Sequence, residues 1–304
     1  MKELWVEKYR PKSINDYLFN SGEIEKSCRY FIENQEIPNL LLSGTQGVGK
    51  STLYKVLLNE IGIDKSDIKR LNASTKTGID QVREIEDFCQ SGVPFNSPFK
   101  VIILEEANGL SRQAQEGLKD VTENYTKYCR FIFTTNHPQK IIPELHSRFQ
   151  WFHFDVFGVD KILEFVLNIL IKENIEIQDE SVLYEHINKY KPDLRKIINS
   201  LQQSSPFGVL NGLSTRTIDD SLNTWKELWA KPDLELLQEL VKQADITSNF
   251  DDYYEIMYMN VKNLQNDLHD NAYISIAEHL YRCSFVSNQE INLNACLIKI
   301  FRKL

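Results

Sequence analysis

Short apolar runs alternate with longer amphipathic segments through the first half of the chain. Runs of strand length occupy residues 39–43, 68–72, 101–104, 131–134 and 151–154. Between them, apolar positions recur at helical spacing over residues 52–61, 78–89 and 111–125. Strands that alternate with helices in this way build a parallel sheet with helices on both faces. The pattern therefore predicts an α/β domain over residues 1–156.

Beyond residue 157 the apolar pattern has helical spacing alone. One predicted helical face carries apolar side chains at intervals of three and four residues, namely Ile162, Phe165, Val166, Ile169 and Leu170. Helix-breaking residues then gather around Pro206 and Gly208, and the spacing is helical again from Trp225 to Leu304. We expect a small helical domain at 157–205, a linker at 206–224 and an all-helical domain at 225–304.

The charge balance limits how this chain can contact nucleic acid. Asp and Glu outnumber Lys and Arg by 43 to 35 over the 304 residues, which gives a net charge of −8. Phosphate contacts need clustered Lys and Arg, so this balance excludes a protein that coats nucleic acid over its whole surface. Basic residues are enriched at 2–12 and acidic residues at 245–270. Any contact with DNA must be local, and the N-terminal half is the better candidate.

Targeting and metal-binding patterns are missing from the sequence. Residues 1–12 contain no apolar core of a signal peptide, and no apolar stretch is long enough to cross a bilayer. We therefore expect an ordered, soluble, intracellular protein without a membrane partner. The 5 cysteines and 6 histidines are scattered without zinc-ligand spacing, which favours reduced thiols and structural or surface imidazoles.

The most specific pattern is a phosphate-binding loop. Residues 44–51 form a complete GxxxxGK[ST] motif between a predicted strand and a predicted helix. Its glycines let backbone N–H groups curl around an anion at the positive end of the helix dipole. Lys50 is expected to neutralise β- and γ-phosphate charge, Ser51 to bind Mg²⁺ and Thr52 to reach a phosphate oxygen. The motif predicts an ATP site made by Gly44, Thr45, Gln46, Gly47, Val48, Gly49, Lys50, Ser51 and Thr52.

Two carboxylates follow the apolar run at 101–104. Beside a phosphate loop, one carboxylate at the end of such a strand serves Mg²⁺ and the next polarises water. We assign Glu105, together with Ser51, to the metal and Glu106 to the general base. Asp is usual at the first position, so the extra methylene of Glu105 requires a repositioned or water-mediated metal contact.

Several separated motifs occur in the order typical of one family. Residues 4–11 are similar to a W-x-E-K-Y-R-P segment, and residues 72–83 are similar to an N-A-S…G-I-D-x-V-R stretch. Asn136 stands at the sensor-1 position, Arg148 at that of the arginine finger, and residues 192–196 match a sensor-2 segment. In these motifs the chain resembles the small subunits of replication factor C and the related phage clamp loaders, within the AAA+ class. The similarity covers roughly the first two thirds of the chain, and Glu105 and Phe149 depart from it by replacing Asp and Cys.

The resemblance implies a fold and a mechanism. It implies that the helical domain at 157–205 is a lid and that the domain at 225–304 is an oligomerising collar. Val6, Tyr9 and Arg10 lie at the adenine, and Arg195 couples the nucleotide to the lid. The catalytic set becomes Lys50, Glu106, Asn136 and, on the ATP of a neighbouring subunit, Arg148.

The same resemblance implies partners. They are a ring-shaped sliding clamp, primer-template DNA bound without sequence preference, and further subunits in a ring, including a distinct one. DNA contacts are expected from helix starts near residues 76–83 and 111–119, through Lys76, Arg83, Arg112 and Lys119. A bacterial, archaeal or phage origin implies the cytoplasm of a prokaryotic host, which we prefer, and a eukaryotic origin implies the nucleus.

Other functions fit part of the sequence. Another AAA+ ATPase, such as a helicase loader or a protein remodeller, would share Lys50, Glu106, Asn136 and Arg148. A P-loop phosphotransferase is disfavoured because Glu106 activates water instead of protecting a phosphoryl group from it. A scaffold subunit that binds ATP but hydrolyses it slowly also stays open. Arg83, Arg112 and Lys119 could form an ordinary solvated face. Asn136 could merely cap the turn that follows it, Arg148 could be a surface arginine that pairs with Glu144, and Arg195 could be a surface residue of the lid.

Overall fold

The computed structural model divides into two compact units, residues 1–212 and 213–304. It describes residues 3–73, 78–212, 215–247, 250–263, 269–283, 285–286 and 288–301. For residues 215–222, 243–247, 251–252 and 263 it describes the backbone alone. The first unit carries every motif found in the sequence, so its architecture decides how the site is assembled.

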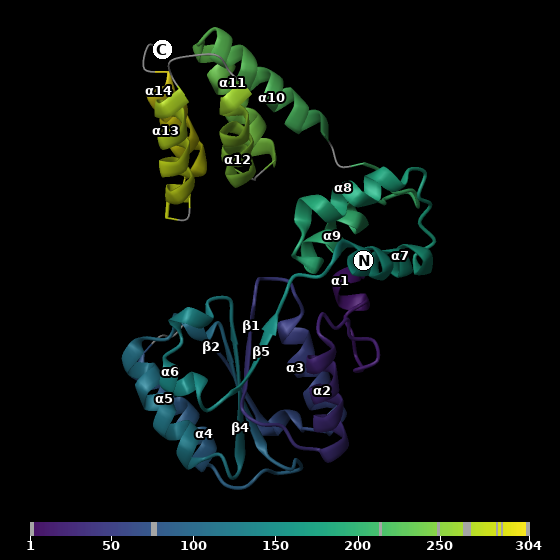
Figure 1. Ribbon diagram of the computed structural model, residues 1–304, viewed down its shortest axis with the longest axis vertical. Coiled ribbons are helices and arrows are strands. Elements are labelled where there is room, and N and C mark those ends of the chain that lie inside the picture. Colours follow the sequence, from purple (N-terminus) through teal and green to yellow (C-terminus); the bar gives the residue numbers. More distant parts are fainter. Residues whose placement is uncertain are drawn as a thin grey trace. The chain divides into compact units, whose positions relative to one another are not determined.

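A five-stranded parallel sheet is the centre of the first unit (Figure 1). Its strands are β1 (Leu40–Gly44), β2 (Ile68–Asn72), β3 (Lys100–Glu105), β4 (Cys129–Thr135) and β5 (Gln150–Phe154). They lie in the order β2-β3-β4-β1-β5, with every neighbouring pair parallel. Parallel strands expose their carboxyl ends along one edge, so the residues that follow β1, β3 and β4 meet there. The predicted α/β fold is confirmed.

Helices cover both faces of this sheet (Figure 1). They are α2 (Gly22–Asn34) and α3 (Lys50–Ile61) on one face, and α4 (Ile79–Gln90), α5 (Arg112–Asn124) and α6 (Pro143–His146) on the other. Along β1, Leu40 and Leu42 belong to the apolar core beneath α2 and α3, whereas Leu41 belongs to the core beneath α4 and α5. Because side chains alternate between the faces of a strand, a strand buried on both faces must be apolar throughout. This explains the continuous apolar runs in the sequence.

Short elements connect these helices and strands. They are the helical turns Lys65–Asp67, Ala107–Gly109 and Pro138–Lys140, all of 3-10 type. The second of these turns follows β3 directly, and the third follows β4. Both therefore shape the loops at the carboxyl edge of the sheet.

A helical subdomain follows the sheet within the same compact unit. It contains α7 (Val159–Lys172), α8 (Glu180–Tyr190) and α9 (Leu194–Gln203). Buried residues of these helices, such as Ile162, Val166 and Ile197, continue the core that lies beneath α2 and α3. Residues 157–205 are thus packed against the α/β domain and are placed relative to the phosphate loop.

The short N-terminal helix α1 (Trp5–Lys8) is attached to this helical subdomain. The Trp5 backbone N–H donates to Gln202 Oε1 at 3.0 Å, and Gln202 Nε2 donates to the Glu3 carbonyl at 3.0 Å. Lys8 Nζ and the Tyr9 hydroxyl both donate to Glu173 Oε1 at 2.6 Å. Residues 3–9 are therefore bonded to α9 and to the end of α7.

The second unit is all helical. It consists of α10 (Thr215–Ala230), α11 (Leu234–Thr247), α12 (Phe250–Asn260), the 3-10 turn Val261–Asn263, α13 (His269–Cys283) and α14 (Gln289–Ile300). Its core includes the rings of Trp225, Trp229 and Phe301. Helix α10 begins at Thr215, inside the segment expected as a linker. None of the helices in the described ranges is both long and apolar enough for a membrane span.

Candidate active site

The loop between β1 and α3 has the backbone of an anion cradle. Gly47 and Gly49 adopt φ angles of 81° and 96°, which glycine tolerates best. A Cβ atom at Gly49 would lie 2.7 Å from the Tyr17 hydroxyl oxygen, and one at Gly47 would lie 2.1 Å from Asp193 Oδ1. Helix α3 begins at Lys50, so its free N–H groups point towards the loop. Close neighbours therefore require glycine at both of these positions of the motif.

The Lys50 ammonium group lies at the centre of this loop. Lys50 Nζ donates to the carbonyl oxygens of Gly44 and Thr45, both at 2.7 Å, and to Asn136 Oδ1 at 2.8 Å. Burial, reinforced by the positive charge of Arg195, lowers the pKa of Lys50 to about 8. Neutral oxygens satisfy this ammonium without neutralising it, which leaves its charge available to an anion. The Asn136 side chain therefore lies beside the phosphate loop, in contact with Lys50.

Glu105 ends β3 with its carboxylate engaged on both oxygens. The Tyr54 hydroxyl donates to Oε1 at 2.8 Å, and Arg70 donates to Oε2 through Nε at 2.9 Å and Nη2 at 2.5 Å. Burial alone would raise the pKa of Glu105, but hydrogen bonds from Arg70 and Tyr54 outweigh it and lower the pKa. The carboxylate is therefore ionised at neutral pH.

Glu106 has an exposed side chain and an unusual backbone. Its φ of 54° and ψ of 43° place it in the left-handed region. Its backbone N–H donates to Thr134 Oγ1 at 3.3 Å, and its carbonyl accepts from the Gly109 N–H at 2.8 Å. This conformation turns the chain at the end of β3, so that two consecutive carboxylates both line the pocket.

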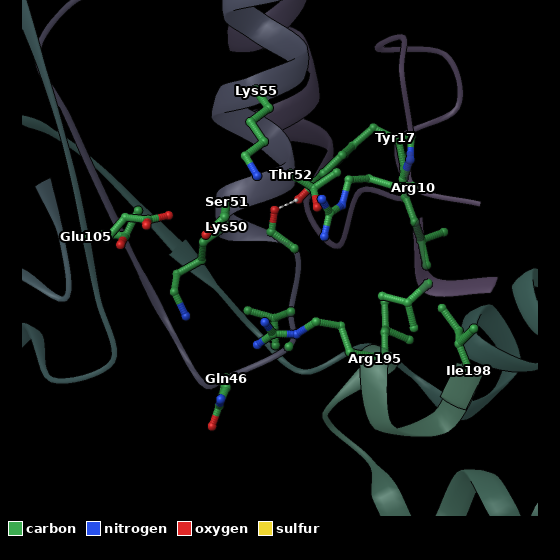
Figure 2. Close-up of a pocket in the computed structure, with 18 of the residues that line it drawn as sticks. Arg10, Tyr17, Gln46, Lys50, Ser51, Thr52, Lys55, Glu105, Arg195 and Ile198 are labelled. Atoms are coloured by element: carbon green, nitrogen blue, oxygen red, sulfur yellow. Dashed lines mark hydrogen bonds between the residues drawn. The ribbon is translucent and has the colours of Figure 1, made fainter. Parts of the chain in front are cut away.

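The loop, the carboxylates and the helical subdomain enclose a pocket of about 360 Å³. Figure 2 shows Arg10, Tyr17, Arg195 and Ile198 on one side of the loop and Glu105 on the other. Apolar and aromatic groups supply part of the wall, among them Val6, Tyr9, Leu18, Phe165, Leu194 and Ile198. Cationic groups supply another part, namely Arg10, Lys50, Lys55, Arg70 and Arg195. A ligand with an aromatic part and several negative charges matches such a wall.

Most residues predicted for the nucleotide line this pocket. They are Val6, Tyr9, Arg10, Gln46, Gly47, Val48, Gly49, Lys50, Ser51, Thr52, Glu105, Glu106, Asn136 and Arg195. Gly44 and Thr45 are not in the wall and instead bind Lys50 through their carbonyl groups. The sequence motifs did not identify Tyr17, Lys55, Arg70, Phe165 or Ile198, which also line the pocket. Helical spacing had marked Phe165, but as part of an apolar helix face.

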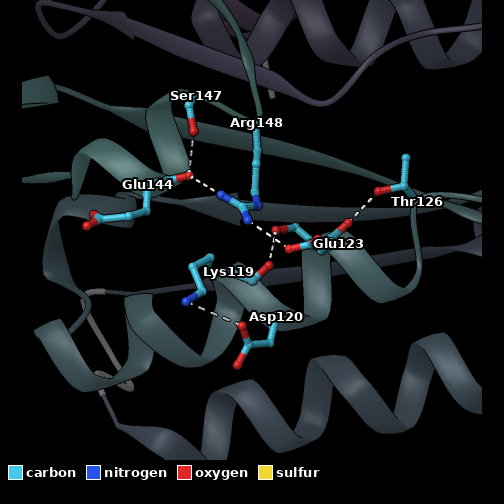
Figure 3. A network of polar contacts seen from close by, with 8 residues as sticks. Lys119, Asp120, Glu123, Thr126, Glu144, Ser147 and Arg148 are labelled. Atoms are coloured by element: carbon cyan, nitrogen blue, oxygen red, sulfur yellow. Dashed lines mark hydrogen bonds and ion pairs between the residues drawn. The ribbon is translucent and has the colours of Figure 1, made fainter.

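Arg148 lies away from the pocket, on the surface of the α/β domain. Its Nη2 forms an ion pair with Glu123 Oε2 at 2.7 Å, and its Nη1 donates to the Glu144 carbonyl at 2.8 Å (Figure 3). The Ser147 hydroxyl donates to the same carbonyl at 3.0 Å. Within one chain, Arg148 is thus held by α5 and α6, and it does not contact the phosphate loop of its own subunit.

The structure describes three of the four residues that were predicted to contact DNA. Lys76 lies outside the described residues. Arg83 pairs with Asp80 at 3.2 Å, Arg112 with Glu116 at 3.2 Å, and Lys119 with Asp120 at 3.6 Å. Each of the three basic side chains therefore has an acidic neighbour on its own helix, and the Arg83 and Arg112 side chains are 71% and 85% exposed. Helices α4 and α5 pack together, which puts the three on one side of the sheet.

Comparison with known proteins relates the whole chain to one family. The model of the AAA family (ATPase family associated with various cellular activities) matches residues 40–154. The replication factor C small subunit of Methanococcus vannielii is 30% identical over 315 residues, with 99% of both chains covered. That of Aeropyrum pernix is 33% identical over 213 residues, covering 68% of this chain and 64% of the relative.

Solved structures show the same fold at lower identity. The Holliday junction branch migration motor RuvB of Thermotoga maritima has a TM-score of 0.56 and 16% identity, covering 72% of this chain and 79% of that one. A mutant of the same motor has a TM-score of 0.58 at 14% identity and covers 93% of this chain and 90% of that one. At such identities the likeness concerns the fold alone.

The relatives match almost the full length of the chain, and the matched AAA region contains the phosphate loop, both carboxylates and Asn136. The chain belongs to the replication factor C small subunit family, and it is an ATP-hydrolysing P-loop enzyme of the AAA class.

Proposed function

We propose that this chain is an ATPase subunit of a sliding-clamp loader, which uses ATP binding and hydrolysis to open a ring clamp and place it on primer-template DNA. The pocket by itself would serve any AAA ATPase. The observation that carries the proposal is the match to replication factor C small subunits over 99% of the chain, which includes the helical C-terminal unit. The complex would be a ring that also contains a distinct subunit. Its place would be the cytoplasm of a prokaryotic cell.

The proposed ATP orientation follows from the two kinds of pocket wall. The base would pack against apolar groups near Val6, Tyr9 and Ile198, while the phosphates would occupy the loop around Lys50. Lys50 would then exchange the carbonyls of Gly44 and Thr45 for phosphate oxygens, an interaction that is stronger because both partners are charged. Arg195, at the start of α9, would bring a second positive charge from the helical subdomain.

Hydrolysis needs a group that orients and deprotonates water. Glu106 supplies an exposed carboxylate beside the loop, and Asn136 supplies an amide already bonded to Lys50. In the proposed reaction, water attacks the γ-phosphorus, its proton passes to Glu106, and ADP leaves with the bridging oxygen. Lys50 stabilises the negative charge that accumulates on the phosphoryl oxygens.

The oxygen-rich wall fits Mg²⁺, which prefers oxygen ligands. The Ser51 hydroxyl and the ionised Glu105 carboxylate line the same pocket and would hold the ion, directly or through water. When bound, the ion neutralises phosphate charge.

Arg148 would complete the site of a neighbouring subunit. Its guanidinium would stabilise transition-state charge there, an effect worth on the order of 10³ to 10⁵ in rate for arginine fingers. To do so it must leave the Glu144 carbonyl and Glu123, whose side chain is 65% exposed and whose carboxylate costs little to solvate. Assembly and catalysis would thereby be coupled.

The test compares ATP hydrolysis by the isolated chain with hydrolysis after addition of a cognate large subunit, ring clamp and primer-template DNA. We expect slow turnover alone and strong stimulation only with all partners. Arg148→Ala should abolish the stimulation without weakening ATP binding by the isolated chain. Glu123→Ala, which removes only the ion-pair partner of Arg148, should keep the stimulation. An isolated chain at full speed, unaffected by Arg148→Ala, would contradict the proposal.

A further inference from the structure

The carboxylate of Glu105 is shared between two protein donors of different mobility. Tyr54, on α3, is fully buried and donates to Oε1. Arg70, on β2, has a side chain that is 53% exposed and donates twice to Oε2. The Tyr54 contact is fixed by packing, whereas the Arg70 contact can be released into solvent. Oε2 is therefore the oxygen that another cation can reach.

The sheet register explains why Arg70 meets this carboxylate. In the β2–β3 pair, Asn72 lies opposite Glu105, and Arg70 lies opposite Ile103. Residues two apart on a strand face the same side, so Arg70 and Glu105 project from the same face of adjacent strands. Lys69 projects from the opposite face and pairs with Glu84 on α4 at 2.7 Å. The longer side chain of Glu, compared with Asp, helps the carboxylate to reach across to Arg70.

We propose that Arg70 is a positioning residue that competes with Mg²⁺ for the Glu105 carboxylate, so that metal binding at the nucleotide site is coupled to the release of Arg70. The inference rests on the proposed ATP site and names its regulation. A guanidinium and a divalent cation repel each other and use the same lone pairs, so both cannot hold Oε2 at full strength. Lys55, which also lines the pocket, adds positive charge that makes the shared arrangement less favourable still.

A plain interstrand ion pair makes a different prediction. A pair that only joins β2 to β3 would affect stability slightly at this exposure, and would leave metal affinity unchanged. Competition instead makes the metal bind more tightly when Arg70 is removed.

The experiment measures binding of a non-hydrolysable ATP analogue to the full-length chain at a series of free Mg²⁺ concentrations. We expect Arg70→Met to lower the Mg²⁺ concentration needed for half-maximal strengthening of binding by roughly threefold to tenfold. Lys69→Met removes the same charge one position away, on the other face, and should change the midpoint by less than about twofold. In a Glu105→Asp background, whose shorter side chain loses Arg70, Arg70→Met should have no further effect.

The outcomes separate the inference from the site on which it rests. An unchanged or raised Mg²⁺ midpoint in Arg70→Met, with ATP analogue still bound, would overturn the competition and leave the nucleotide site in place. An Arg70→Met effect that persists in the Glu105→Asp background would also overturn it, because the effect would not pass through the Glu105 contact. Failure of the unaltered chain to bind the analogue at saturating Mg²⁺ would instead overturn the proposed site.

Discussion

At the scale of the residue, Glu106 combines a proposed catalytic role with a backbone conformation that its residue type disfavours. Its left-handed backbone, with φ of 54°, is unfavourable for a side chain with a Cβ and costs about 1–3 kcal/mol. The surrounding contacts hold it there, since its N–H binds the Thr134 hydroxyl and its carbonyl binds the Gly109 N–H. The strain lies at the proposed general base, where a fixed carboxylate direction is useful.

His186 gives a prediction about pH and stability. It is fully buried, with Nδ1 2.6 Å from Ser200 Oγ and Nε2 3.2 Å from the Asn211 carbonyl. Burial lowers the pKa of His186 in the folded state below its ordinary value, so the unfolded chain binds its proton first as pH falls. The stability from neutral His186 is present above about pH 6.5 and is lost below it, by up to about 1.4 kcal/mol per pH unit.

Urea denaturation at a series of pH values between neutral and mildly acidic checks this expectation. The stability advantage of the unaltered chain over His186→Gln should shrink as pH falls. His137→Gln, at an exposed position, should keep the pH dependence of the unaltered chain. An advantage that is independent of pH would show that protonation of His186 is not linked to folding.

Sequence motifs predict those site residues that lie close together in the sequence, but not those that come from distant segments. The loop at 44–51 and the carboxylates at 105–106 each form a short pattern whose chemistry depends on adjacent positions. Tyr17 and Arg70 have no such pattern, because each reaches the pocket from an element whose placement depends on the whole fold. The register of β2 against β3, which brings Arg70 to Glu105, cannot be read from either strand alone.

At the scale of elements, predicted strands and helices agree with the structure within about two residues, as hydrophobic periodicity allows. Hydrophobic periodicity does not predict the contact between the phosphate loop and α9. Asp193 caps α9 by accepting from the Arg195 and Lys196 N–H groups, and the same side chain lies against Gly47. The helix that supplies Arg195 therefore rests directly on the loop.

This contact predicts the effect of a single methyl group. In Gly47→Ala the new Cβ would overlap Asp193, so α9 must move away from the loop and ATP affinity should fall roughly tenfold or more. Gly62→Ala is a matched control, because Gly62 has a φ of 80° against 81° at Gly47 but no atom near the new Cβ. It should lose about 1–2 kcal/mol of stability and keep its affinity for ATP. Equal affinities in calorimetry would show that the loop does not need α9 in this place.

Helices α4 and α5 carry the proposed DNA contacts. Each phosphate contact contributes about 0.9 to the slope of log affinity against log salt concentration. We expect alanine at Arg83, Arg112 and Lys119 together to reduce this slope by roughly 2 to 3 in the assembled loader. The control replaces three basic residues on α2 and α7, namely Lys26, Arg29 and Lys161. An equal slope in both triple variants would place the DNA elsewhere.

At the scale of the molecule, the two compact units have separate apolar cores. The core of the second unit is centred on Trp225, which is 1% exposed and lies 5.3 Å from Trp229 and 5.9 Å from Phe301, measured between ring centroids. Removing a buried Trp side chain costs about 3–5 kcal/mol.

Trp225→Ala should therefore destabilise the second unit while the first keeps its ATP affinity. Scanning calorimetry of the full chain should show one transition at lower temperature, and titration with ATP should give an unchanged dissociation constant. Tyr281→Ala, at a side chain that is 70% exposed, should leave both quantities unchanged. A parallel loss of ATP affinity in Trp225→Ala would show that the units do not fold independently.

The attachment of α1 to the helical subdomain has a consequence for nucleotide exchange. Gln202 and Glu173 hold residues 3–9, so rotation of α7 and α9 would carry Val6 and Tyr9 along with Arg195 and Ile198. The walls proposed to contact the base and the phosphates would withdraw in one rigid movement, while the sheet and Lys50 would stay in place. We expect ADP departure to follow a single opening step, with no intermediate in which the base is free but the lid still touches the phosphates.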